Sequence, residues 1–362
     1  MPNKCVCVFN NNLKYIMAAK QRIDYIDLMK GIVIMLVLMI HFDIEFGNHI
    51  DDMLLYVRMP VYIFLSGLFY SNYSSFKELV IKKTNKYIIP LIFFSIPALV
   101  LYSSSLPYAS IPQFKSDVYY LITTLDFVNA NPALWFLKLL FLLAMLCYAF
   151  ERVLYRLRSV YKLAIAAIVS GLWHIVSGAI YREYYAGEWF MKLLIDSDIS
   201  PALTVFVIYY FAYTVRLIVL RDNHDKRVMT AILPVAVGVL YLFADSNVYF
   251  ALGLFGNNYF KALMASLAGI YIVYYVCYMI RHLPYLSYVG RYSLVVLCTH
   301  LIVSFCMEEY LNICNAHFRF AIVLATAPAL IWLLKRYMPH FTAQKDLIRL
   351  DEKGKIKISF TD

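Results

Sequence analysis

Long apolar runs separated by short polar or basic connections recur along the whole chain. An early run, IDLMKGIVIMLVLMIHF at residues 26–42, stays apolar over several helical turns and lacks the alternation of a half-buried strand. A helix of about 20 apolar residues crosses the hydrocarbon core of a bilayer. The pattern predicts about ten membrane-spanning helices, which we place at residues 25–42, 53–70, 87–104, 132–150, 160–180, 200–220, 228–244, 262–280, 293–311 and 318–334.

The composition supports an all-α, polytopic integral membrane protein. Of the 362 residues, 62% are hydrophobic and 15% are charged, and the mean hydropathy is +0.66. A soluble domain is about half apolar and about a quarter charged. A membrane β-barrel would alternate apolar and polar positions in segments of about 10 residues, whereas the runs here are continuous and longer. The lipid bilayer is therefore the expected environment of the protein.

The chain shows no short-period repeat, low-complexity linker or soluble domain. We therefore expect a single membrane domain at residues 22–335, between a cytoplasmic N-terminal segment at 1–21 and a basic cytoplasmic tail at 336–362. The N-terminal segment lacks the basic, apolar and small-residue layout of a cleaved secretory signal. The tail is short and charged, so we expect it to lie on the surface or to be disordered.

The basic residues predict the orientation of the protein. With the N-terminus in the cytoplasm, 24 of the 33 basic residues fall on the cytoplasmic side and 5 on the opposite side. Because cytoplasmic loops are enriched in lysine and arginine, both termini are predicted to be cytoplasmic. The net charge of +10 then reflects topology and attraction to anionic lipid, and no nucleic-acid partner is expected. The sequence does not indicate an oligomeric state.

Two polar residues interrupt the first predicted span. Lys30 and His41 are eleven residues apart, so they share one helix face about 16 Å and three turns apart, and Asp27 precedes Lys30 by one turn. Titratable groups inside a span are costly and are functional candidates that face the bundle interior. Two other interpretations stay open: Lys30 extends to the membrane interface, and His41 bonds a neighbouring helix.

Four stretches of the chain match one known family in the expected order. The matching residues are Asp27, Lys30, Gly31 and His41 in IDLMKGIVIMLVLMIH; Met59, Pro60, Ser66 and Gly67 in RMPVYIFLSGLFY; Trp135 and Phe136 in ALWFLKLLF; and Gly290, Ser293 and His300 in YVGRYSLVVLCTH. On these residues the chain resembles the membrane-bound acyltransferase 3 family over about residues 22–335.

The chain departs from the family pattern at two places. Arg58 precedes Met-Pro, where related polysaccharide acetylases often have histidine. The turn KKTNKYIIP has Lys83 and Lys86, where the family often has two arginines. Lysine keeps the positive charge but lacks the bidentate fork of arginine, so the departure affects the expected strength of phosphate binding.

The resemblance implies an acyltransferase of the bacterial inner membrane. It implies transfer of an acyl group, most often acetyl, from cytoplasmic acyl-CoA to a hydroxyl of a cell-surface polysaccharide or its lipid-linked precursor. Acyl-CoA, a glycan and the bilayer are then the expected partners. We expect no metal, because the candidate ligands His41, His174, His300 and Glu308 are spread over three spans.

The resemblance also implies a catalytic group in the outer half of the membrane. His41 is the expected general base, because a neutral imidazole removes a proton from a sugar hydroxyl at neutral pH. A covalent acyl-histidine relay is the alternative. Asp27 is expected to hold Lys30. Arg58 is expected to orient the thioester or a glycan oxygen or to stabilise oxyanion charge, with extension to the interface as the alternative.

The remaining candidates concern binding. Coenzyme A is a polyanion, and its phosphates are expected to bind Lys82, Lys83 and Lys86. Ser293 and His300 lie two turns apart on one helix face, where they either line the substrate cavity or bond neighbouring helices. Two aromatic residues either shape the acceptor site or belong to the interfacial belt of the membrane. These are Trp135 and Phe136.

Two other functions compete with glycan O-acylation. A lipid or glycan transporter or flippase would also place charges along a path through the membrane, although no inverted repeat with matching broken helices is evident. Within the acyltransferase class, the acceptor could instead be a lipid or a small metabolite.

Overall fold

The computed structural model describes residues 23–105, 131–186, 198–221, 223–351 and 356–359, so the predicted segment 1–21 lies outside the described residues. The described chain is almost entirely helical, which confirms the all-α class. Its elements are α2 (Asp24–His41), α3 (Asn48–Leu68), α4 (Phe76–Lys83), η1 (Thr84–Ile88), α5 (Ile89–Ser105), η2 (Pro132–Leu134), α7 (Trp135–Val153), α8 (Ser159–Ala186), α10 (Ile199–Val219), α11 (Lys226–Phe243), β1 (Val248–Tyr249), η3 (Phe250–Leu252), β2 (Leu254–Phe255), α12 (Tyr259–Ile280), α13 (Pro284–Arg291), α14 (Ser293–Leu311), α15 (Ala316–Tyr337), β3 (Ile348–Leu350) and β4 (Ile356–Ile358).

Eight of the described helices are long and apolar enough to cross a membrane. They correspond to the last eight of the ten predicted segments, and they confirm a polytopic membrane protein. The first two predicted segments also form long helices, α2 and α3, but each of these carries three charged residues. The total number of spans and the side on which the termini lie stay predictions.

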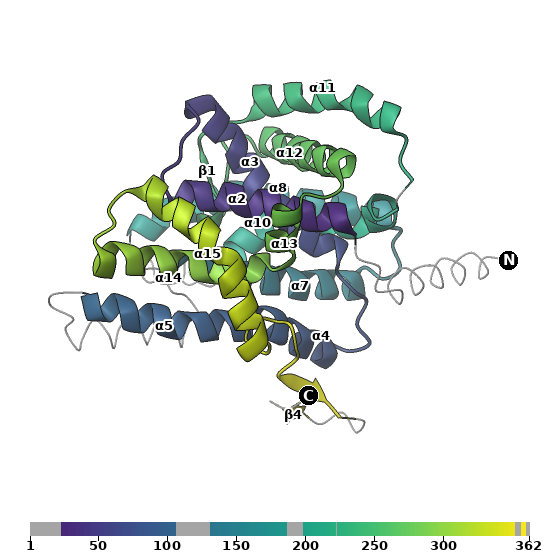
Figure 1. Cartoon of the computed structure of the whole chain (residues 1–362). Helices are drawn as coiled ribbons and strands as arrows, with labels where there is room; N and C mark the ends of the chain where they lie inside the picture. Colours follow the sequence, from purple (N-terminus) through teal and green to yellow (C-terminus); the bar gives the residue numbers. More distant parts are fainter. Residues whose placement is uncertain (1–22, 106–130, 187–197, 222, 352–355, 360–362) are drawn as a thin grey trace.

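Helix α2 lies inside the bundle, which explains how it carries charged residues. Ten of its 18 residues are buried, and it contacts α3, α12, α13 and α14. In Figure 1, α2, α5 and α14 run across the view in the same general direction, and α15 crosses α14 obliquely. A charged group inside a span is stable only where protein or a water-filled cavity, rather than lipid, surrounds it.

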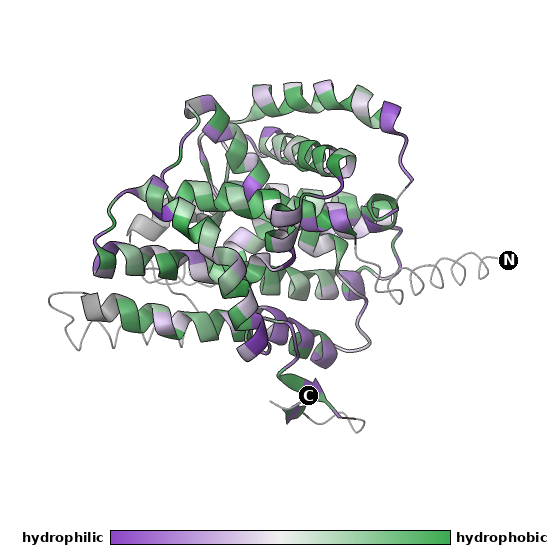
Figure 2. Cartoon of the chain, viewed as in Figure 1, coloured by the Kyte–Doolittle hydropathy of each residue, from purple (hydrophilic) through white to green (hydrophobic). Residues whose placement is uncertain are grey.

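The outer helices carry the apolar surface that faces lipid. Ile175 of α8 and Leu242 of α11 are each 72% exposed. Figure 2 shows that hydrophobic residues cover most of α11 at the edge of the bundle, while hydrophilic residues gather on α4 and in the connections. Since exposed isoleucine and leucine on this scale are unfavourable in water, these faces indicate the lipid boundary of the protein.

Two short antiparallel hairpins complete the fold. Strand β1 pairs with β2 in the connection between α11 and α12. Strand β3 pairs with β4 in the C-terminal tail, beyond the last helix. Part of the predicted tail therefore forms a hairpin, and its second strand, Ile356–Ile358, is exposed.

Candidate functional site

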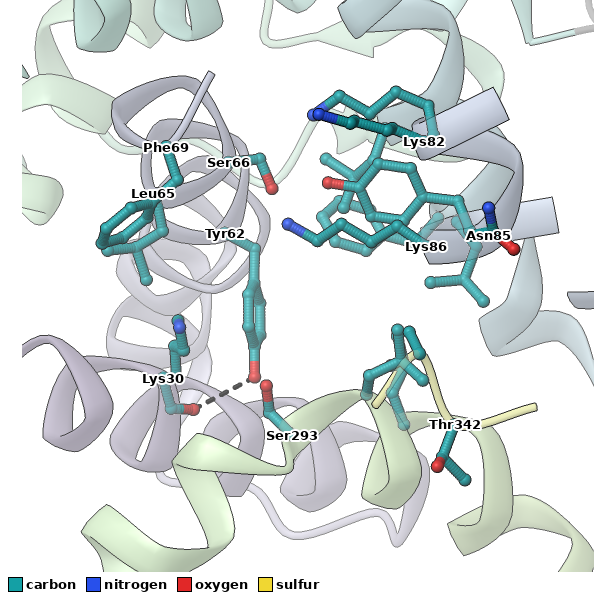
Figure 3. Close-up of a pocket in the computed structure, with 18 of the residues that line it drawn as sticks. Lys30, Tyr62, Leu65, Ser66, Phe69, Lys82, Asn85, Lys86, Ser293 and Thr342 are labelled. Carbon is teal, nitrogen blue, oxygen red and sulfur yellow. Dashed lines mark hydrogen bonds between the residues drawn. The ribbon is translucent and has the colours of Figure 1, made fainter. Parts of the chain in front are cut away.

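A cavity of about 450 Å³ lies where α2, α3, α7 and α14 meet the turn between α4 and α5. Figure 3 shows lysine side chains entering it from two directions, Lys30 from α2 and Lys82 and Lys86 from the α4–α5 region. Its lining residues are Lys30, Tyr62, Leu65, Ser66, Phe69, Tyr73, Lys82, Lys83, Asn85, Lys86, Tyr87, Phe136, Leu137, Leu140, Arg291, Ser293, Leu294, Leu297, Thr342, Ala343, Gln344 and Asp346.

All three lysines predicted to bind phosphate lie in this cavity. Their helix changes from α to π geometry at η1, where the Ile89 amide donates to the Thr84 carbonyl five residues back. Pro90 has no amide hydrogen to donate to the Lys86 carbonyl in the α-helical pattern, which favours the wider turn. π-Helical turns are frequent at functional sites, and this one presents Lys86 and Tyr87 to the cavity.

Lys83 is surrounded by aromatic rings. Its side chain is buried, with the whole residue 3% exposed, and its Nζ lies 5.7, 5.8 and 5.7 Å from the ring centroids of Tyr70, Tyr73 and Tyr87. The negative faces of aromatic rings attract a cation at this range. The arrangement holds an ammonium group in a largely apolar setting, where an anionic ligand would interact with it strongly.

Lys82 differs from Lys83 in its surroundings. It is about half exposed, and its Nζ lies 2.9 Å from Glu78 one turn earlier in α4. The Glu78 carboxylate neutralises part of the positive charge of Lys82. Lys83 and Lys86 are therefore the stronger candidates for binding an anion in the cavity.

Lys30 forms the opposite wall. Its Nζ lies 3.9 Å from Asp27 Oδ1 and 5.4 Å from the centroid of the Phe69 ring. The Tyr62 hydroxyl donates to the Lys30 carbonyl at 3.0 Å, and the Ser293 hydroxyl lies beside it in Figure 3. The structure thus places Lys30 next to Asp27, as the spacing predicted, and brings Ser293 into the same wall.

Helix α2 is held against α13 by two glycines. A Cβ atom on Gly31 would lie 2.0 Å from the Leu286 carbonyl oxygen, and one on Gly290 would lie 1.9 Å from the Asp27 carbonyl oxygen. No side chain fits between the two backbones. This close approach positions Lys30 and Arg291, which flank the two glycines, at the cavity.

Replacing Gly31 with alanine is expected to destabilise the protein by at least about 1–3 kcal/mol, because the added methyl group overpacks a backbone–backbone contact. Thermal unfolding of the detergent-solubilised protein measures the effect. Gly238→Ala in α11 is the matched control, since nothing lies within 4 Å of a Cβ atom there. An unchanged unfolding temperature for Gly31→Ala would contradict the packing argument.

A second polar cluster lies further along the same helices. The rings of His41, the last residue of α2, and His300 of α14 are 5.1 Å apart between centroids. Arg58 of α3 is 5% exposed and is near enough to His41 to interact with it electrostatically. Among the described residues, the buried Nε of Arg58 has no hydrogen-bond partner. The three side chains form a polar group in which Arg58 and His300 are buried and His41 is partly buried.

The tautomer of His300 follows from its hydrogen bond. Its Nδ1 lies 3.0 Å from the Val296 carbonyl oxygen, which can only accept, so Nδ1 carries the proton. Nε2 then has a free lone pair. This atom is buried and has no hydrogen-bond partner in the described part of the chain. His300 therefore presents a proton acceptor beside His41.

Asn131 fixes the start of α7 deep in the bundle. It is fully buried, and its Nδ2 donates to the Cys298 carbonyl of α14 at 2.9 Å. The following aromatic residues therefore lie beside α14. Phe136 lines the cavity and packs edge-on against Tyr62, with 5.9 Å between ring centroids. Trp135 packs against Phe136 and lies outside the cavity lining.

The two clusters do not share one cavity in this structure. Lys30 lines the cavity, but His41, Arg58 and His300 do not. Lys30 and His41 were predicted to share one helix face, and only the lysine end of that face lines the cavity. The buried side chains of Ile34 and Val37 occupy α2 between them. On α14, Leu297 is the last lining residue, and His300 follows three residues later.

The C-terminal tail forms a wall that sequence reasoning missed. Thr342, Gln344 and Asp346 line the cavity. Asn85, itself in η1, ties the tail to the lysine turn: its Nδ2 donates to the Ile348 carbonyl at 2.7 Å, and its Oδ1 accepts from the Leu347 and Ile348 amides at 2.8 and 2.9 Å. Asn85 mimics the edge of a strand and fixes the tail beside the lysines.

Replacing Asn85 with alanine is expected to release this part of the tail, because two half-buried backbone amides lose their acceptor. Hydrogen exchange at Leu347 and Ile348 should become faster by about tenfold or more, the equivalent of about one hydrogen bond. Asn223→Ala, at an exposed position between α10 and α11, is the control. Unchanged exchange at both amides would contradict the tether.

A buried ion pair also escaped the sequence analysis. Lys138 Nζ of α7 lies 3.1 Å from Asp198 Oδ2 at the start of α10, with both side chains about 5% exposed or less. Removing one partner of such a buried ion pair strongly destabilises a protein. The pair therefore helps to hold α7 against the start of α10. Among the described residues, no group of three or more histidine, cysteine or acidic side chains is placed to hold a metal ion.

The fold and the site together define a polytopic membrane protein with a lysine-lined cavity at one end of its bundle and a pair of adjacent imidazoles further along the same helices. An acyltransferase domain family model, that of the acyltransferase 3 family, matches residues 23–336. The chain belongs to this family and is a multi-pass membrane acyltransferase. No curated protein and no solved structure matches it.

Proposed function

We propose that the protein transfers an acyl group, acetyl in the first instance, from cytoplasmic acyl-CoA to a hydroxyl of a cell-surface polysaccharide or its lipid-linked precursor in the bacterial inner membrane. One observation carries the proposal: helices α2, α3 and α14 each line the lysine cavity and each carry one member of the polar cluster of His41, Arg58 and His300 further along. The same three helices would therefore contact the polyanionic donor in the cavity and carry the proton-accepting histidines and Arg58 further along.

The lysine cavity would hold the phosphates of the donor. Lys83 and Lys86 supply positive charge, and Arg291 and Lys30 add to it from the other walls. The loops on this side of the bundle are predicted to face the cytoplasm, where acyl-CoA is made. The lysines act as point charges rather than bidentate forks, so affinity depends on their number and burial.

The thin pantetheine arm would run from this cavity toward His41. Ile34 and Val37 of α2 and Leu297 of α14 lie between, so they must separate or change rotamer to admit the arm. The thioester would then reach the histidine pair without passage of the nucleotide through the membrane. Transfer across the membrane would need only the acyl group to move.

The chemistry would proceed at the polar cluster of His41, Arg58 and His300. His41 accepts the proton of the acceptor hydroxyl as its oxygen bonds to the thioester carbonyl carbon, and Arg58 stabilises the charge on the carbonyl oxygen. The carbon–sulfur bond breaks, and the leaving thiolate takes the proton back from His41. His300 accepts a hydrogen bond from the acceptor through Nε2. An acyl-histidine relay through His41 is the alternative sequence of steps.

The acetyl content of envelope glycans, measured by mass spectrometry and NMR in cells with and without the gene, tests the proposal. Loss of O-acetyl groups with the glycan still exported supports it. Loss of the glycan itself would instead indicate a transporter or flippase. Unchanged glycan with an altered lipid or metabolite acylation would move the acceptor to that class.

A further inference from the structure

A second pocket adjoins the lysine cavity. It has a volume of about 230 Å³ and lies between the loop after α3 and the ends of α7 and α10. Tyr73 lines both spaces, so one aromatic side chain contributes to the walls of both. The residues that line the smaller pocket, which we call the tyrosine pocket, are Tyr70, Asn72, Tyr73, Tyr148, Glu151, Arg152 and Tyr213.

Two lysines of the larger cavity lie within cation–π distance of tyrosine rings that line the smaller pocket. Lys82 Nζ lies 5.9 Å from the Tyr73 centroid, and Lys83 Nζ lies 5.7 Å from that of Tyr70. The tyrosine pocket therefore begins about one aromatic ring away from the charges that attract phosphate. A ligand whose phosphates bind these lysines has an attached group at the mouth of the tyrosine pocket.

The tyrosine walls are held in place by one another. Tyr70 packs edge-on against Tyr73 and Tyr213, with ring centroids 5.6 and 5.4 Å apart. The Tyr213 hydroxyl donates to Asn72 Oδ1 at 2.9 Å, which orients the amide. Burial raises the pKa of Tyr73 to about 12, so its hydroxyl stays protonated and neutral beside an anion at physiological pH. The pocket is preorganised for a flat ligand.

Polar groups of both kinds line the rim. Arg152 lies over the Tyr148 ring, 5.2 Å from its centroid, and donates to the Ser74 carbonyl at 3.1 Å. Glu151 accepts from Tyr210 at 2.5 Å through one oxygen and from Lys162 at 2.7 Å through the other. Each carboxylate oxygen has a further lone pair. The pocket thus offers a fixed acceptor and, from Asn72 and Arg152, donors.

We propose that the tyrosine pocket binds the adenine base of the acyl-CoA donor. The inference rests on the proposed function for the identity of the donor, and it adds the recognition of its base. Adenine has a flat aromatic face for the tyrosines, ring nitrogens that accept from Asn72 or Arg152, and an exocyclic amino group that donates to Glu151. A base with a carbonyl oxygen in place of that amino group would place one hydrogen-bond acceptor against another, the Glu151 carboxylate.

Two donors of different length test the proposal on the purified protein. Acetyl-CoA carries the base, and acetyl-4′-phosphopantetheine lacks it. Removing an aromatic contact to a base weakens binding by about tenfold to a hundredfold. Tyr148→Leu should therefore raise KM for acetyl-CoA by about this factor. Asn72→Leu, which removes a hydrogen bond, should raise it by about tenfold, with KM for the truncated donor unchanged in both variants. Binding of adenosine 3′,5′-bisphosphate, measured by calorimetry, should weaken in parallel without any dependence on turnover.

Tyr155→Leu is the matched control, because this tyrosine is 65% exposed just beyond α7 and lies outside the pocket. Equal losses with both donors, or unchanged binding of adenosine 3′,5′-bisphosphate in both pocket variants, would overturn the base assignment while leaving acyl transfer standing. Failure of the wild-type protein to use either donor would instead overturn the proposed function.

Discussion

Replacing His41 with alanine is expected to reduce acyl transfer by about 10²–10⁴-fold, the usual contribution of a positioned general base. His41 ends α2 within 5.1 Å of the His300 ring and beside the buried Arg58, so it is the residue of α2 placed to take a proton from an acceptor hydroxyl. Transfer of labelled acetyl groups from acetyl-CoA in membrane vesicles measures the rate, and immunoblotting measures the amount of protein.

The control for this variant is His317→Ala, at an exposed histidine on α15. It should leave transfer unchanged. Full retention of transfer in His41→Ala, at normal abundance, would remove His41 from the mechanism. If His300→Ala lost all transfer while His41→Ala retained it, the base would be the free Nε2 of His300. The two single variants therefore separate the members of the histidine pair.

Replacing Lys83 and Lys86 together with alanine is expected to raise KM for acyl-CoA by several hundredfold. A hydrogen bond to a charged group contributes about 1.5–3 kcal/mol, and each 1.4 kcal/mol is tenfold in affinity. Lys83 is buried among three tyrosines, where screening by solvent is weak, so its loss should have the larger effect. Initial rates at varied acetyl-CoA concentration measure the change.

Lys77→Ala is the matched control, because this exposed lysine on α4 lies outside the cavity lining. A second measurement uses salt. Affinity of the wild-type protein for the anionic donor should fall with ionic strength, and the double variant should respond less. An unchanged KM in the double variant would refute the phosphate-binding role of the lysine turn, whatever the outcome for His41.

Each element of the site was predictable to a different extent. The spacing of Asp27 and Lys30 in α2 placed them on one face, and the structure has them 3.9 Å apart. The lysines of KKTNKYIIP were recognisable as a basic turn, and they line one cavity. The continuity of that cavity with His41 was expected from the shared face of α2, but the apolar side chains between them depend on how α14 packs against α2.

Other contacts of the site could not be predicted, because the sequence of one span does not indicate which distant residues pack against it. Asn85 was one polar residue in a lysine-rich turn, yet it holds a tail more than 260 positions further along the chain. The tyrosines were too numerous, at 32, to separate those of a pocket from those of the membrane interface. Lys138 lies inside the predicted span 132–150, and its partner Asp198 caps the start of another helix, α10.

By itself the sequence determined that this protein is an all-helical membrane protein, which stretches of the chain form its long apolar helices, and which residues share a helix face. Those properties depend on hydropathy and on the 3.6-residue period, and both are local. The tertiary structure alone decided that His41 meets His300, that Asn85 ties the tail to the lysines, and that four tyrosines from three elements form one pocket. Such contacts depend on packing between helices distant in the chain, about which the period of any one helix carries no information.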